Sequence, residues 1–165
     1  MMMAAASVTH AETPVFPSVK ASNLNKKVLQ LPADLQGHPR LVLVAFERQQ
    51  QQDVDTWLAV MPALQKEHPG LAYYELPTIS RLNGMVRWFI DNGMRGGIPD
   101  PAQRERTITL YLDKAPFEKA LAIGSEKQIH ALLLDRDHKV IWRAEGRYSA
   151  EKGTALAAAL ARLKS

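Results

Sequence analysis

The chain has 165 residues, a formal net charge of +4 at pH 7 and no cysteine. This length favours a single domain with a sizeable core, and 46% hydrophobic with 23% charged residues is an ordinary globular composition. The lack of cysteine excludes disulfides, thiolate metal sites and thiol catalysis. No apolar run is long enough for a membrane-spanning helix. The chain also lacks the dense Lys/Arg cluster interleaved with aromatics that would indicate nucleic-acid binding.

The first residues are small and apolar and then become polar. Thr9-His10-Ala11 resembles the small-x-small cleavage pattern of a secretory signal, although no Lys or Arg precedes the short apolar stretch. Residues 1–17 are therefore expected to be a signal remnant or a disordered leader, followed by one domain over residues 18–165. A periplasmic or exported location is expected, and a cytoplasmic one is not excluded.

The first half of the domain is expected to alternate strands with a helix. Lys26–Pro32 is a strand candidate after a turn at Asn23–Asn25, and Arg40–Phe46 is an apolar run typical of a central strand covered on both faces. Asp53 can cap the helix that follows, and Pro62 is expected to kink it. The apolar positions at helical spacing are Trp57, Val60, Met61 and Leu64.

The second half is expected to close the chain with a hairpin and a helix. The expected strands are Leu71–Pro77, Arg106–Asp113, Gln128–Asp135 and Val140–Gly146. The expected helices are Ser80–Gly97, Ala115–Ile123 and Ser149–Lys164, with Ser80 and Ser149 as caps. The element order ββαβαβαββα predicts an α/β fold with a mixed sheet between two helical layers.

These features together resemble the thioredoxin-like superfamily, most closely its branch of cytochrome-maturation thioredoxins and peroxiredoxins. The resemblance covers Val19 to Lys164. It rests on a short hairpin, an apolar strand ending in Phe46, a helix carrying "MPALQK", and "IHALLLDRDHKVIWRAEG", which is similar to the closing hairpin of that branch. It implies a three-layer α/β/α sandwich.

The redox residues implied by that resemblance are missing. The two active-site cysteines would fall at Gln51 and Val54, or at Val54 and Trp57, depending on the alignment anchor. The cis-proline of the family would fall near Ile129 or His130, where a trans peptide is expected because a non-proline cis bond costs about 3 kcal/mol. The resemblance therefore implies a redox-inactive member.

The chain also resembles, in a narrower way, the thioredoxin-like proteins that assist assembly of the mitochondrial ATP synthase. The residues that fit are Trp57, Asp135, Val140 to Trp142 and Gly146. This resemblance implies a non-enzymatic assembly factor that acts on subunits of a membrane complex.

Catalytic and cofactor sites of other kinds find little support. The histidines, at positions 10, 38, 68, 130 and 138, lack metal-ligand spacing. No serine lies in a nucleophile-elbow sequence. The glycines of Arg95–Pro101 follow a helix and lack the Lys-Ser/Thr of a phosphate loop. No metal, cofactor or catalytic residue is predicted.

The leading hypothesis is a non-catalytic binding or assembly protein that recognises a protein partner, such as a membrane-complex subunit, through the former active-site loop. In redox members this surface grips an extended peptide by main-chain hydrogen bonds. The expected contacts are Arg48, Gln49, Gln51, Asp53, Trp57, Arg95 and His130. The alternative is a thiol-independent enzyme using Glu47, Arg48 and His130, or a small-ligand-binding domain at the same loop.

Overall fold

A computed structural model describes residues 13–81, 90, 92–94 and 96–163. The strands are β1 (Val19–Asn23), β2 (Val28–Leu31), β3 (Arg40–Ala45), β4 (Ala72–Ser80), β5 (Ile108–Leu112), β6 (His130–Leu134) and β7 (Val140–Glu145). The helices are the 3₁₀ turn η1 (Arg48–Gln50), α1 (Gln51–Leu58), α2 (Met61–Glu67), α4 (Pro101–Arg106), α5 (Lys114–Ala120) and α6 (Ala150–Leu163). In this part of the chain, no helix is long and apolar enough to cross a membrane.

The strands form one mixed sheet in the order β2-β1-β5-β4-β3-β6-β7. β3, β4 and β5 are parallel to one another at the centre. The pairs β1–β2, β1–β5, β3–β6 and β6–β7 are antiparallel. The carboxyl ends of the three parallel strands therefore lie at one edge of the sheet, next to the start of β6.

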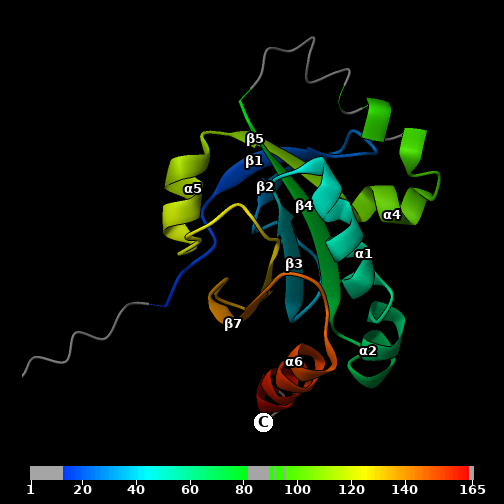
Figure 1. Cartoon of the computed structure of the whole chain (residues 1–165), viewed down its shortest axis with the longest axis vertical. Helices are drawn as coiled ribbons and strands as arrows, with labels where there is room; N and C mark the ends of the chain where they lie inside the picture. Colours follow the sequence, from blue (N-terminus) through cyan, green and yellow to red (C-terminus); the bar gives the residue numbers. More distant parts are fainter. Residues whose placement is uncertain (1–12, 82–89, 91, 95, 164–165) are drawn as a thin grey trace, which may run out of the picture.

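Helices cover both faces of this sheet, which confirms the predicted three-layer α/β class (Figure 1). Successive residues of β3 alternate between two cores: Val42 and Val44 face the layer of α5, and Leu41 and Leu43 face the layer of α1, α2 and α6. Because both faces are covered, the strand reads as a continuous apolar run rather than as an alternating one.

The fold includes residues before the expected boundary at residue 17. Phe16 is only 3% exposed and packs edge-on against Phe117 of α5, with ring centroids 5.7 Å apart. Its backbone N–H donates to the carbonyl of His138, and Val140 N–H donates to the carbonyl of Pro14. The expectation of a leader through Pro17 is therefore wrong for these residues, because the Phe16 ring packs against α5 and the backbone pairs with the β6–β7 hairpin. Residues 1–12 lie outside the described residues.

The predicted long helix after β3 is two helices. Asp53 lies in the first turn of α1 rather than at its cap, because the turn η1 starts the helical segment five residues earlier, at Arg48. Pro62 lies at the start of α2, where its missing N–H has no intrahelical partner to lose. The expected kink is thus a break between α1 and α2.

Three further differences concern an unpredicted strand, the end of β4 and an unpredicted helix. β1 was not predicted as a strand, because its alternating small and polar residues carry a weak apolar pattern. Ser80 ends β4 instead of capping a helix, and the helix predicted over residues 80–97 falls largely outside the described residues. α4 was missed, although Asp100 caps it by accepting from Ala102 N–H at 3.0 Å and a proline at the first helical position is a start signal.

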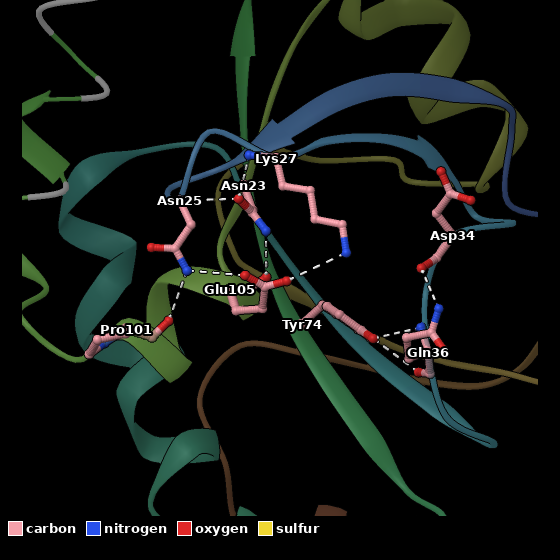
Figure 2. A network of polar contacts seen from close by, with 8 residues as sticks. All are labelled: Asn23, Asn25, Lys27, Asp34, Gln36, Tyr74, Pro101 and Glu105. Atoms are coloured by element: carbon pink, nitrogen blue, oxygen red, sulfur yellow. Dashed lines mark hydrogen bonds and ion pairs between the residues drawn. The ribbon is translucent and has the colours of Figure 1, made fainter.

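Asparagine side chains fasten α4 to the turn between β1 and β2 (Figure 2). Asn23 Oδ1 accepts from the N–H groups of Asn25 and Lys27, both at 3.0 Å. Asn25 Nδ2 donates to Pro101 O at 3.1 Å and to Glu105 Oε2 at 3.0 Å. The hairpin turn and α4 therefore form one rigid corner beside β5.

Replacing Phe16 should show that the N-terminal segment belongs to the core. Phe16→Ala is expected to lower the free energy of unfolding by about 3 kcal/mol, because the ring leaves a cavity against Phe117. Val15→Ala is the control, since Val15 is 46% exposed and should change stability by roughly 0.5 kcal/mol or less. Urea unfolding of both variants measures the difference, and equal effects would contradict a structural role for this segment.

Candidate functional site

The candidate site lies at the carboxyl edge of the parallel strands, between β3 and β6. From β3 the chain proceeds through β4 and β5 on one side, whereas β6 lies on the other side of β3. In open α/β sheets a reversal of strand order of this kind marks the place where ligands bind. Two loops form its walls: residues 46–50 after β3 and residues 124–129 before β6.

Gln50 ties the two walls together. Its side-chain Oε1 accepts from the backbone N–H of Phe46 at 2.8 Å and of Glu47 at 3.2 Å. Its Nε2 donates across the edge to the carbonyl of Glu126 at 2.7 Å. Gln50 is only 4% exposed, so among the four consecutive glutamines it has a structural role, and its bonds occupy the gap between the loops.

Neighbouring glutamines are exposed but held in fixed orientations. Gln51 Nε2 donates to Asp55 Oδ1 at 2.9 Å and to Glu75 Oε1 at 3.0 Å. Gln49 Nε2 donates to Glu47 Oε2 at 2.6 Å. Carboxylates only accept hydrogen bonds, so the nitrogen end of each amide must face them. Within the described residues the Oε1 atoms of Gln49 and Gln51 accept no hydrogen bond, so they are left to accept bonds from outside.

Glu75 helps to fix the orientation of the Gln51 amide, and it was not predicted from the sequence. It lies in the middle of β4 and is 3% exposed. Besides Gln51, it accepts from Thr107 Oγ1 at 3.2 Å and from Gln103 Nε2 at 3.5 Å. A single charge inside the apolar stretch "LAYYELP" was the available signal, because a buried carboxylate requires donors around it.

His130 belongs to the buried wall of the site. It is 2% exposed, its Nε2 lies 2.8 Å from Ser125 O, and its ring packs edge-on against Phe46 at 6.2 Å. Its Nδ1 lies 3.8 Å from Glu145 Oε1. In the described part of the chain no hydrogen bond or ion pair joins His130 to Glu47 or Arg48.

Trp57 is a core residue, which corrects its prediction as a contact residue. Its side chain has no exposed surface, and its Nε1–H donates to Gly146 O at 3.0 Å. It packs edge-on against Trp142 and Tyr148, with centroids 6.2 and 5.4 Å away. The helical spacing with Val60, Met61 and Leu64 was the signal that it faces the sheet.

The remaining predicted contacts divide between the surface and the part that is not described. Arg48, Gln49 and Gln51 are exposed and Asp53 is partly buried, all on η1 and the first turn of α1. Arg95 lies outside the described residues. Of the predicted residues, Arg48, Gln49, Gln51 and Asp53 therefore lie on one segment, η1 and the first turn of α1, whereas Trp57 and His130 are buried.

An unpredicted carboxyl pair lies on the wall before β6. Burial, a hydrogen bond to Glu126 and the negative charge of Glu126 raise the pKa of Glu118 to about 7, against the opposing effect of Lys114. Hydrogen bonds with Glu118 and then with Lys114 lower the pKa of Glu126. Lys114 Nζ lies 2.9 Å from Glu126 Oε2. Lys114 and Glu118 stand at i, i+4 spacing in the sequence, but their contact with Glu126 depends on the fold.

The edge also contains a cavity of about 360 Å³, lined by Ser80, Arg81, Leu112, Asp113 and Lys114. These residues come from the ends of β4 and β5 and the start of α5. None of them belongs to the loop after β3, so this cavity does not support the alternative of a ligand site at the polar loop.

The cis peptides of the described residues precede Pro32 and Pro39, and the bond before His130 is trans as expected.

Comparison with solved structures identifies the architecture. A candidate electron transfer protein from Aquifex aeolicus VF5 superposes with a TM-score of 0.63 at 11% identity, covering 92% of this chain and 98% of that one. A thiol-disulfide oxidoreductase from Bacteroides fragilis superposes with a TM-score of 0.54 at 13% identity, covering 88% and 98%. A thioredoxin family thiol:disulfide interchange protein from Chlorobium tepidum gives 0.52 at 15%, covering 92% and 99%.

The chain has a thioredoxin-like fold. This confirms the main resemblance found in the sequence, and the absence of cysteine is consistent with a redox-inactive thioredoxin-like protein. At these identities the likeness extends to the fold alone. No family model matches the chain, and no curated protein matches it by sequence.

Gln50 should be the glutamine on which the stability of this thioredoxin-like edge depends. Gln50→Ala leaves two backbone N–H groups and one carbonyl without their partner, and should lower the free energy of unfolding by roughly 2–3 kcal/mol. Gln52→Ala, two residues later and exposed, should change it by about 0.5 kcal/mol or less. Thermal and urea unfolding measure both, and equal losses would refute the bridging role.

Proposed function

We propose that this protein is a non-catalytic, redox-inactive thioredoxin-like binding protein that recognises a protein partner through the exposed face of η1 and α1. The exposed residues of this face are Glu47, Arg48, Gln49, Gln51 and Asp55, and Asp53 is partly buried on the first turn of α1. The observation that carries the proposal is the fixed orientation of Gln51, whose Nε2 is held by Asp55 and Glu75. The Gln51 amide thereby keeps its nitrogen inward and presents its oxygen to solvent.

The chemistry of this face specifies the kind of partner. The oriented amides of Gln49 and Gln51 offer oxygen acceptors, and Glu47 and Asp55 add exposed carboxylates. Arg48 is the residue on this face that adds a cationic donor. The partner is therefore expected to supply donors, as a segment with Lys or Arg side chains does.

Assembly of a membrane complex is the biological setting that we propose for this binding. Its support is the sequence resemblance to ATP-synthase assembly proteins, and a Lys- or Arg-bearing segment beside a membrane would fit the acceptor-rich face. A periplasmic or exported location stays a prediction from the N-terminal sequence.

Site-specific photo-crosslinking tests the proposed face. A photo-reactive residue at position 52, in extracts of the source cells, should form one dominant protein adduct. The same photo-reactive residue at position 155, an exposed position of α6, should not form this adduct. Gln51→Lys should reduce this adduct at least about fivefold, because the ammonium group replaces the outward acceptor and adds repulsion toward a cationic partner.

Ala155→Lys is the matched control, since it adds the same charge on another exposed surface. It should leave the adduct unchanged, and both variants should melt like the wild type. An adduct that survives Gln51→Lys in a folded protein would refute this face as the binding surface. Absence of any protein adduct from position 52 would refute the proposed function.

A further inference from the structure

The seven-stranded sheet ends in two edge strands, β2 and β7. The outer side of an edge strand carries backbone N–H and C=O groups that no neighbouring strand binds. At β2 a cap from its own chain meets these groups: the N–H of Gln30 donates to Asp34 Oδ2 at 2.7 Å, and the carbonyl of Gln30 accepts from Asp34 N–H at 2.9 Å. The outer side of β2 is therefore blocked at Gln30.

On the outer side of β7, the backbone groups of Arg143 and Glu145 point away from β6. Antiparallel pairs alternate between those that exchange hydrogen bonds and those that do not. Gly146 N–H donates to the carbonyl of Ile129 at 2.9 Å, and the same register continues through Ala144. Residues 144 and 146 thus bond to β6, and the N–H and C=O groups of residues 143 and 145 face outward.

The N-terminal segment covers only the beginning of this edge. Val140 N–H donates to the carbonyl of Pro14 at 2.8 Å. Beyond Val140, no hydrogen bond within the described residues engages the outward groups of Arg143 and Glu145. Ile141, where the open part begins, is 36% exposed. Residues 141–145 of β7 therefore form an open edge.

The two residues whose backbone faces outward carry opposite charges. Arg143 and Glu145 are two apart in a strand, so their side chains project from the same face of the sheet. Arg143 donates to the carbonyls of Leu121 and Ala122 at the end of α5, and its guanidinium has five N–H groups, so donors remain for a further partner. The side chain of Glu145 is 60% exposed and lies 3.8 Å from His130 Nδ1. The open edge thus presents a positioned cation beside an accessible carboxylate.

Two copies of this edge can pair antiparallel about a twofold axis, and charge selects the register. An axis at residue 143 or 145 sets two arginines or two glutamates directly opposite each other, which is destabilising. An axis at Ala144 sets Arg143 of each copy opposite Glu145 of the other, where opposite charges stabilise the pair. In this register both pairs can exchange backbone hydrogen bonds, and Ala144, with a single methyl group, lies where the two strands approach most closely.

We propose that the open edge of β7 binds the same edge of a second copy of this chain, antiparallel, with Arg143 facing Glu145 across the twofold axis. The two sheets then continue into each other. So short a strand pair buries less than the roughly 1,200 Å² of a standard interface, so a weak, concentration-dependent dimer is expected. This interaction goes beyond the proposed function and uses no residue of the face on η1 and α1.

Sedimentation velocity of the full chain, between roughly 10 µM and 1 mM, tests for this weak dimer. The wild type should shift from monomer toward dimer across this range. Glu145→Arg should raise the dissociation constant at least about tenfold, because it sets two cations opposite each other in both pairs. Glu151→Arg makes the same change at an exposed residue of α6 and should leave the association unchanged.

Mixing charge variants tests the register. Arg143→Glu and Glu145→Arg should each associate poorly alone and should form a heterodimer when mixed, because a glutamate then faces an arginine in both pairs. If Arg143→Glu does not fold, since it loses the contact with α5, Glu145→Pro supplies the second test. Proline removes the outward N–H of residue 145 and spares the bonds to β6, so it should abolish the dimer.

Hydrogen exchange followed by NMR locates the contact. The backbone amides of Arg143 and Glu145 should become more protected as the protein concentration rises, whereas that of Val28 on the other edge strand should not change. A monomer at 1 mM would overturn the proposal. So would protection of both amides that is independent of concentration, because the chain's own N-terminal segment would then cover the edge. A dimer that persists in Glu145→Arg would place the contact elsewhere and would also overturn it.

Discussion

The hydrogen bonds of Gln50 are the contacts on which the carboxyl edge depends. An amide side chain offers both a donor and an acceptor without carrying charge, so it can be 4% exposed and still satisfy polar groups on two loops. A charged residue at this place would need a counter-ion, and an apolar one would leave the backbone of Phe46, Glu47 and Glu126 without partners. Gln50 thus closes the edge by hydrogen bonding alone.

Glu75 determines which end of the Gln51 amide faces solvent at the exposed part of the edge. Its contacts extend from Gln51 on α1 to Gln103 on α4 and to Thr107, just before β5. Since α4 is also fastened to the turn between β1 and β2 (Figure 2), the proposed binding face is anchored to the antiparallel end of the sheet. A buried carboxylate with neutral donors therefore fixes which end of the Gln51 amide faces outward.

The sequence allowed the architecture to be predicted better than the site. The run Arg40–Phe46 and the closing hairpin have strong apolar patterns, and both were placed correctly because burial on a sheet leaves a local record in the sequence. Gln50 and Gln51 are identical in type and adjacent, yet one is buried and one exposed, and only the tertiary fold separates them. Trp57 was assigned to the surface by analogy with the redox loop, although its spacing indicated the core.

The carboxyl pair shows the same limit for electrostatics. The spacing of Lys114 and Glu118 is visible in the sequence, but it predicts an ordinary helical ion pair. Glu126, brought in by the loop before β6, pairs with the lysine, and burial together with Glu126 raises the pKa of Glu118. A perturbed pKa of this kind arises from a third group whose position no local pattern encodes.

The amide of Gln51 is held independently of the loop before β6. It is oriented by Asp55 and Glu75, and neither of these residues contacts that loop in the described part of the chain. A change in the loop would therefore leave the amide of Gln51 in place. A partner bound only to η1 and α1 would contact one wall of the edge, whereas one that also contacts residues 124–129 would span it.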